Sequence, residues 1–272
     1  MKLPRNHSVV CALVDFDVIQ CAQQKHSRQN RAVVDPWPGG VISYSFDRIP
    51  STVQSSVSKF KMSRLEAMRR ITSNFAPFSM LTFRNVPSDE AFLHFQVPDD
   101  PTECSATVGY SRFARVNLGA SEHCWKDDTI LHELGHVAGL HHTQNRDDRD
   151  EYIRVAPGKE ELRPGALFFD FRSIMMYPLD ILHATLTTKG RTRMMLQGIE
   201  EHKVGHGTAL SRIDFQTLVL QYGDKNMPAK AATDLQPYIH LLWVLAGVSV
   251  LLVVVVFLRH RSKQQKQVKV PF

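Results

Sequence analysis

The feature that most constrains this chain of 272 residues is a group of histidines at fixed spacing between positions 132 and 142. His132 and His136 are four residues apart, which on a helix places both imidazoles on one face, one turn apart. Two neutral nitrogens at that separation can bind one Zn²⁺, each at about 2.0–2.1 Å. Glu133 follows the first histidine, where a carboxylate can act as general base without binding the metal itself.

Two further residues complete a longer pattern. Gly139 can adopt a positive φ and end the helix, after which the returning chain lets His142 supply a third nitrogen from another direction. Three histidine ligands leave one tetrahedral position open, which is typical of a catalytic rather than a structural zinc site. We therefore expect one catalytic Zn²⁺, held by His132, His136 and His142. A solvated helix without metal is the alternative, and the fixed offsets make it a poor explanation.

The full spacing, H-E-x-x-H-x-x-G-x-x-H, is the metzincin signature. Metzincins also have a methionine in a tight turn below the metal, and Met175, within residues 173–177, resembles that residue. The resemblance implies an α+β fold: a two-lobed zinc protease domain with a mixed twisted sheet, a zinc helix and a Met-turn. For Met175 taken alone, ordinary core packing is the alternative.

The segment after the third histidine indicates which family of metzincins the chain resembles. Residues 146–152 read R-x-D-R-D-x-Y and resemble the corresponding segment of the astacin family. Tyr177, two residues after Met175, resembles the astacin tyrosine that is an additional zinc ligand and then stabilises the transition-state oxyanion. The resemblance runs from about residue 37 to residue 222. It implies a zinc metalloendopeptidase of class EC 3.4.24 that acts on protein or peptide substrates, with Glu133 and Tyr177 as catalytic residues.

Two positions depart from the usual astacin pattern. Thr143 follows the third histidine, where astacins usually have a glutamate that receives the new N-terminus after propeptide removal, so that linkage is not expected here. Met176 replaces the usual histidine of the Met-turn, and we expect it to line a substrate subsite without affecting zinc binding. Serralysins share the tyrosine but usually have proline after the third histidine. A serralysin-like metzincin is therefore the runner-up.

Hydrophobic periodicity predicts the elements of the first half of the domain. Residues 41–46 alternate after a Pro/Gly turn and predict a strand, and residues 81–83 and 92–97 are also strand-like. Apolar residues between positions 53 and 75 recur at steps of three, four or multiples of these and predict one amphipathic helix on the sheet.

Two further predictions concern the segment before the zinc helix and the end of the domain. The resemblance implies that residues 115–119, just before the zinc helix, form the cleft edge with which an extended substrate pairs. Near the end of the domain, Ser211 and Asp214 predict a capped helix, and Gly223 ends its apolar pattern.

Cys104 and Cys124 are the two cysteines of the predicted protease domain, and both match cysteines that are paired in astacins at the same separation. The resemblance therefore implies a disulfide between them, which suits an oxidising compartment. On the chain-entropy model, closing a loop of about 20 residues stabilises the fold by roughly 3 kcal/mol. Two reduced, buried thiols are the alternative.

The regions before and after the domain differ from it in composition. Residues 1–30 predict a weak signal peptide or a propeptide-like leader, because the apolar run of residues 9–14 is short for a secretory signal. Residues 31–223 hold the protease domain, and residues 224–237 a stalk.

The net charge is +6, but five Lys and Arg residues lie in the last fourteen residues, without Asp or Glu. The protease region is nearly neutral, which indicates no nucleic-acid partner.

Residues 238–258 contain no Asp, Glu, Lys or Arg and are rich in Leu and Val. This segment is long enough for one C-terminal transmembrane helix, with a buried core helix as the alternative. Residues 259–272 are basic, and the positive-inside rule places such a tail in the cytosol. We expect a single-pass membrane protein whose protease domain is extracellular or lumenal.

Two hypotheses of different classes follow. The first is a membrane-anchored zinc endopeptidase that uses Glu133 as general base. The second is a catalytically inert, membrane-anchored binding or adhesion module on the same fold. The intact Glu133 and the three histidines weigh against the second hypothesis, because a module without turnover has no need of them.

Overall fold

The structure is a computed structural model that describes residues 7–13, 19–25, 35–155 and 167–223. The chain divides into two compact units, Met1–Asp224 and Lys225–Phe272, and every described residue belongs to the first. The predicted stalk, the predicted span at 238–258 and the basic tail lie outside the described residues. Within the described ranges, no helix combines the length and the apolar character needed to cross a membrane.

Most strands precede the two helices of the second half, as in an α+β fold. The strands are β1 (His7–Leu13), β2 (Ile19–Lys25), β3 (Val41–Ser45), β4 (Thr52–Gln54), β5 (Lys61–Ser63), β6 (Thr82–Asn85), β7 (Leu93–Gln96), β8 (Cys104–Ala106), β9 (Ala114–Leu118), β10 (Ile153–Arg154) and β11 (Thr185–Leu186). The α-helices are α1 (Arg64–Ser73), α2 (Asp127–Val137), α3 (Thr188–Leu196) and α4 (Arg212–Tyr222).

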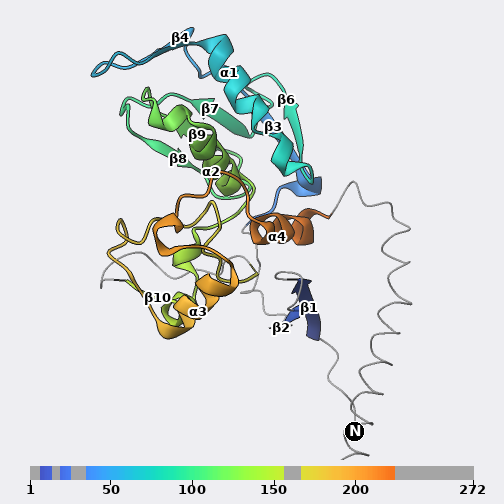
Figure 1. Ribbon diagram of the computed structural model, residues 1–272. Helices are drawn as coiled ribbons and strands as arrows, with labels where there is room; N and C mark the ends of the chain where they lie inside the picture. The colour runs from blue at the N-terminus through green and yellow to red at the C-terminus, as the bar shows by residue number, and fades with distance from the viewer. Residues whose placement is uncertain (1–6, 14–18, 26–34, 156–166, 224–272) are drawn as a thin grey trace, which may run out of the picture. The chain divides into compact units, whose positions relative to one another are not determined.

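A five-stranded sheet in the order β6-β3-β7-β9-β8 supports the zinc helix α2, which packs against β8 and β9 (Figure 1). The strands β6, β3, β7 and β9 are parallel, whereas β8 pairs antiparallel with β9. The sheet is mixed, as the resemblance implied. The predicted edge was wrong, because residues 115–118 belong to the inner strand β9 and β8 is the edge. Edge strands are often short, and three residues of β8 leave little pattern to read.

Helix α1 is shorter than the helix predicted between positions 53 and 75. It begins at Arg64, where the Ser63 side chain accepts a hydrogen bond from the amide of Glu66 and caps the helix. Upstream, β4 and β5 form a hairpin that pairs Val53 with Met62. Val57 lies between these two strands and is exposed, so its helical spacing from Val53 has no structural basis.

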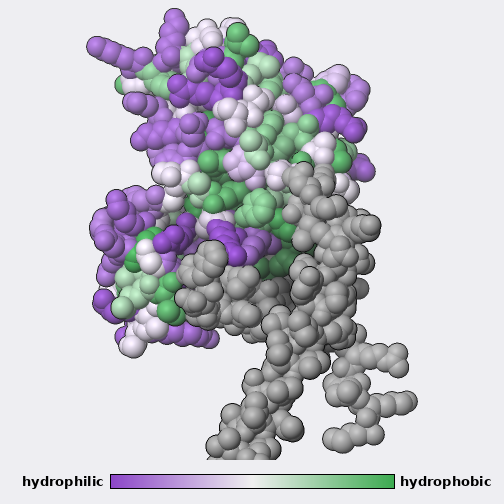
Figure 2. All heavy atoms as spheres, turned by 45° about the vertical axis from the view of Figure 1, so that its right-hand side comes forward, coloured by the Kyte–Doolittle hydropathy of each residue, from purple (hydrophilic) through white to green (hydrophobic). Residues whose placement is uncertain are grey.

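Helix α4 begins and ends as predicted. The Ser211 hydroxyl accepts from the Asp214 amide while the Asp214 carboxylate accepts from the Ser211 amide, which is a complete capping box. Gly223 follows the helix with φ 79°. On the face drawn in Figure 2, hydrophobic residues gather near the middle, and hydrophilic residues cover most of the upper part. Among the described residues, Phe215 and Leu220 of α4 remain partly exposed.

Two hydrophobic cores meet at the Met-turn. The first lies among the sheet, α1 and α2 and includes Met175. The second comprises Ile153, Phe169, Phe171, Met176, Leu179, Leu182, Leu186 and Val204. Met176 is therefore a core residue, and its predicted place in a subsite wall was wrong. Consecutive methionines anchor the turn in two different cores, which fixes its position between them.

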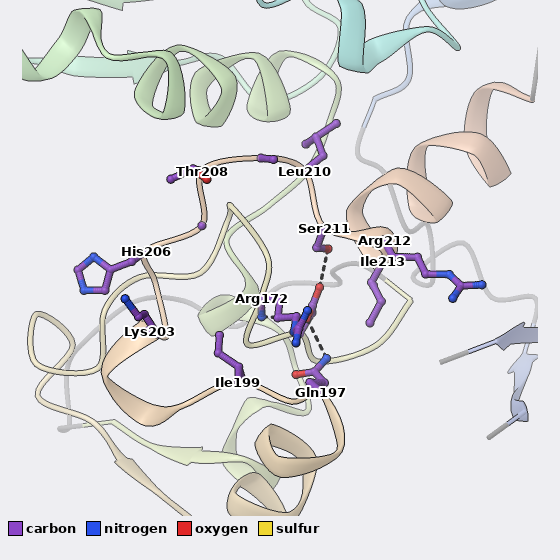
Figure 3. A pocket seen from close by; sticks show the side chains of 13 residues that line it. Arg172, Gln197, Ile199, Lys203, His206, Thr208, Leu210, Ser211, Arg212 and Ile213 are labelled. Carbon is purple, nitrogen blue, oxygen red and sulfur yellow. Dashed lines mark hydrogen bonds between the residues drawn. The ribbon is translucent and has the colours of Figure 1, made fainter. Parts of the chain in front are cut away.

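Asp170 and Asp214 form a buried carboxylate pair beside the Met-turn. Asp214 accepts a hydrogen bond of 2.7 Å from the Ser173 hydroxyl. Asp170 accepts from Ser211 Oγ at 2.5 Å and from Gln197 Nε2 at 2.8 Å, the two bonds drawn in Figure 3. Burial, followed by the neighbouring Asp170 charge, raises the pKa of Asp214 to about 6. Burial also raises the pKa of Asp170.

We expect Asp170→Asn to flatten the pH dependence of stability. A carboxyl whose pKa is raised on folding stabilises the fold at low pH, and this contribution is lost as pH rises from the unfolded value of 3.8 through about 6. Without the Asp170 charge, the pKa of Asp214 falls. The stability lost over this pH range is then smaller, by on the order of 1 kcal/mol. Urea unfolding across this pH range measures the difference, with exposed Asp180→Asn as control. If the free energies of unfolding of wild type and Asp170→Asn change with pH in parallel, the prediction is wrong.

Candidate metal centre

Three histidine side chains converge at the end of α2. Nε2 of His142 lies 3.1 Å from Nε2 of His132 and 3.0 Å from Nε2 of His136. Tetrahedral Zn–N bonds of about 2.0–2.1 Å place pairs of nitrogens roughly 3.3 Å apart, close to these distances. In the part of the chain that the structure describes, these three histidines have ligand atoms close enough together to hold one metal ion.

Backbone carbonyls fix the tautomers of the two helix histidines. Nδ1 of His132 lies 2.8 Å from the carbonyl oxygen of Ile174, and Nδ1 of His136 lies 2.8 Å from that of Leu140. Because a carbonyl oxygen only accepts, each Nδ1 carries the proton and each Nε2 lone pair faces the centre. Such outer hydrogen bonds orient ligating imidazoles and increase their basicity.

Burial keeps the three imidazoles neutral. Burial first, and then the neighbouring histidines, lowers the pKa of His136 to about 3 and that of His142 to about 2. Burial lowers the pKa of His132 as well. Neutral imidazoles with converging lone pairs are the form that binds zinc, so this donor set fits Zn²⁺.

The end of α2 redirects the chain toward the third histidine. Gly139 has φ 96°, and its amide donates to the His136 carbonyl at 2.8 Å. The amide of Leu140 donates to the Gly135 carbonyl at 2.9 Å, which completes a Schellman motif. This left-handed turn brings His142 opposite the two histidines of the helix.

Met175 packs directly beneath the zinc helix. A Cβ atom at Gly135 would lie 2.7 Å from Met175 Sδ, so only glycine fits there without a shift. Reasoning from the sequence missed Gly135. The signal was a glycine in a helix interior, which is unfavourable unless close packing requires it.

Tyr177 lies beside the histidines. Its ring centroid is 4.4 Å from that of His142 and 6.0 Å from that of His132. The Tyr177 amide donates to Oε1 of the buried Gln144 at 3.0 Å. Gln144, which the sequence analysis did not single out, thus connects the segment after the third histidine to the Met-turn.

Glu133 is buried, with 4% of its surface exposed, and its Oε2 has no hydrogen-bond partner among the described residues. Burial raises the pKa of this carboxyl to about 8. A buried acceptor without a partner is costly, and such groups are concentrated at functional sites. Glu133 directly follows His132, one of the three converging histidines.

Cys104 and Cys124 form a disulfide, which confirms the pairing that the resemblance implied and excludes two free thiols. The bond connects the first residue of the edge strand β8 to the segment just before α2. It therefore holds the edge of the sheet close to the zinc helix.

The pocket of about 570 Å³ drawn in Figure 3 is separate from this group. Its lining includes Arg172, Lys203 and His206 together with the start of α4, and none of the site residues predicted from the sequence. The chemistry of the three histidines therefore does not depend on it.

Comparison with known proteins identifies the domain. Residues 29–162 match the model of a family described as Astacin (Peptidase family M12A). The chain contains an astacin-family domain. Zinc metalloproteinase nas-25 of Caenorhabditis elegans is 24% identical to it over 198 residues, which cover 63% of this chain and 47% of the relative. Astacin-like metalloprotease toxin 2 of Loxosceles intermedia is 28% identical over 185 residues, which cover 62% of this chain and 63% of the relative.

One similar solved structure is high choriolytic enzyme 1, a hatching-enzyme zinc-protease from the medaka Oryzias latipes. It has a TM-score of 0.48 and 20% identity, and the match covers 71% of this chain and 96% of the other. The chain spans about half the length of nas-25. The astacin family binds one catalytic zinc ion, and this domain contains a group of three histidines that could hold one metal ion. The family match favours astacins over the serralysin-like runner-up.

We expect Gly135→Ala to destabilise the astacin domain by about 1–3 kcal/mol, because the added methyl group overpacks against Met175. In a Met175→Ala background the clash is absent. There the same substitution should be neutral or stabilising by up to about 1 kcal/mol, since alanine favours helix. Urea unfolding of the four proteins of this double-mutant cycle measures the change of sign. Equal effects in both backgrounds would contradict the contact.

Proposed function

We propose that the astacin domain is a zinc-dependent endopeptidase. The observation that carries this proposal is the buried Oε2 of Glu133, which has no hydrogen-bond partner among the described residues and belongs to the residue directly after a histidine of the three-nitrogen site. A purely structural zinc site has four protein ligands and needs no such base. The match to a peptidase family supports the same conclusion.

The three histidines, Glu133 and Tyr177 have different roles in the proposed peptide hydrolysis. The three histidines would hold the zinc ion, which would supply Lewis acidity to a peptide carbonyl and to a water molecule. Burial raises the pKa of the free Glu133 carboxyl, and a positive charge held at the neighbouring histidines would favour its carboxylate form, which can act as base. Glu133 accepts a proton at Oε2 and passes it to the leaving amine. The Tyr177 hydroxyl donates to the oxyanion that develops on the scissile carbonyl.

The substrate is a protein or peptide segment in extended conformation. Among the described strands, β8 pairs only with β9, so its outer edge is open to a further strand. An extended peptide can add to such an edge through main-chain hydrogen bonds. The disulfide at Cys104 keeps this edge near the zinc helix, which supports a peptide path past the metal.

We expect Glu133→Gln to lower the rate of peptide hydrolysis by about 10²–10⁴-fold while the protein retains one zinc ion. Tyr177→Phe should lower it by about 10²–10³-fold, because one oxyanion donor is lost. Turnover of a fluorogenic peptide and the zinc content of each protein measure both effects. Glu122→Gln, which changes an exposed residue before α2, is the matched control.

Full activity of Glu133→Gln would exclude the proposed base. The inert binding module makes a different prediction, because the wild-type protein would then leave a denatured protein substrate intact. Fragments that form without chelator and disappear with it would exclude that alternative.

We further propose that residues 238–258 span a membrane, with the astacin domain on the extracellular or lumenal side and residues 259–272 in the cytosol. The uncharged span and the basic tail after it support this orientation. A disulfide in the astacin domain is also typical of an oxidising compartment.

Carbonate extraction of membranes from cells that make the full chain tests the membrane anchor. The chain should remain in the pellet, and deleting residues 238–258 should release it. In sealed microsomes, added protease should remove a C-terminal epitope tag and leave the astacin domain intact. Protection of the tag would reverse the orientation, and release of the full chain by carbonate would exclude the anchor.

A further inference from the structure

The C-terminal end of α2 leaves carbonyl groups that the helix itself cannot pair. The Schellman motif satisfies the carbonyls of Gly135 and His136. Those of Val137 and Ala138 point beyond the helix end and require other donors. Two aromatic side chains, Trp37 and Tyr222, supply them.

Trp37 and Tyr222, here called the helix-end pair, come from far along the chain. Trp37 Nε1 donates to the Val137 carbonyl at 2.7 Å, and the two residues are 100 positions apart. The Tyr222 hydroxyl donates to the Ala138 carbonyl at 3.0 Å, across 84 positions. The same hydroxyl accepts a hydrogen bond of 3.3 Å from the Trp37 amide, so the two residues hold each other in place.

The surroundings of the helix-end pair keep these bonds intact. Trp37 is buried, and its ring meets that of Tyr110 edge-on at 5.4 Å. The Gly109 amide, next to Tyr110, donates to the His136 carbonyl at 2.9 Å. Burial raises the pKa of Tyr222 to about 12, so its hydroxyl stays protonated and can donate at any physiological pH.

We propose that Trp37 and Tyr222 are positioning residues of the zinc site, which set its metal affinity by holding the turn between His136 and His142. This inference rests on the proposed zinc site and names the contacts that hold it in shape. Trp37 lies near the start of the described domain and Tyr222 at the last residue of α4. The geometry of the zinc site thus depends on both ends of the domain.

The path from the helix-end pair to the ligands is short. The Ala138 carbonyl immediately precedes Gly139, and the next residue, Leu140, accepts the Nδ1 hydrogen bond of His136. If the Val137 and Ala138 carbonyls lose these donors, fewer hydrogen bonds hold the turn, and a shift of the turn moves the Leu140 carbonyl and His142 with it. An outer hydrogen bond that orients a ligand typically contributes 10–100-fold to metal affinity.

The experiment compares the full-length wild-type chain with Trp37→Phe, Tyr222→Phe and the double variant. Each substitution keeps an aromatic ring and removes the donor. The zinc dissociation constant, from competition with a chromophoric chelator, should rise roughly tenfold in each single variant. The double variant should lose less than the product of the two effects, because both residues act on one turn. The visible spectrum of the Co²⁺-loaded protein should also shift, because it reports ligand geometry.

Trp125→Phe and Tyr44→Phe are the matched controls. Trp125 is equally buried and donates an indole hydrogen bond of 2.9 Å to Gly119, but it lies before the other end of α2. Tyr44 is a buried tyrosine of β3. Both controls should lose stability in the metal-free protein while their zinc dissociation constants stay within roughly twofold of wild type.

Unchanged zinc affinity in both Trp37→Phe and Tyr222→Phe would overturn the proposal and leave the helix-end pair a purely structural contact. Should Trp37→Phe not fold, Tyr222→Phe decides alone, because it removes a single oxygen from a half-buried ring. Zinc binding that survives the substitution His142→Ala in an otherwise wild-type chain would instead refute the zinc site itself. The two failures are therefore distinguishable.

Discussion

The metal centre depends on two hydrogen bonds from imidazole Nδ1 atoms to backbone carbonyls. His132 donates to Ile174 in the Met-turn, and His136 donates to Leu140 in the turn after α2. Each bond fixes a tautomer and aims Nε2 at the same point as His142. Because the acceptors are backbone atoms, their position is set by whatever holds these two turns. The rest of the domain can be understood as the support of these turns.

The Met-turn is held by both hydrophobic cores. Met175 packs in the first core, Met176 packs in the second, and the Ser173 hydroxyl donates to the buried carboxylate of Asp214 in α4. Close-packed side chains leave a backbone little freedom to shift. The Ile174 carbonyl therefore has a fixed position, although it lies in irregular chain. Gly135 is part of the same arrangement, since a Cβ atom there would lie 2.7 Å from Met175 Sδ and the packing would have to shift.

The local part of this site could be predicted from the sequence, whereas its long-range support could not. The His132 and His136 spacing predicts a shared helix face, because helix geometry alone determines it. The edge strand β8 was missed because three residues carry too little pattern. The hydrogen bonds of the helix-end pair and the Ser173–Asp214 bond join residues from 41 to 185 positions apart. No local periodicity encodes such contacts, which depend on how the two cores pack.

Thr143 shows how this domain departs from its family without losing the site. Its side chain is buried, and its amide donates to the Met175 carbonyl at 2.9 Å. That bond comes from the backbone, so any residue except proline can make it. A glutamate buried here would require a cation as partner, whereas a hydroxyl needs only an ordinary hydrogen bond. Position 143 thus supports the Met-turn through its main chain. The alignment of the third histidine does not require a buried ion pair beside it.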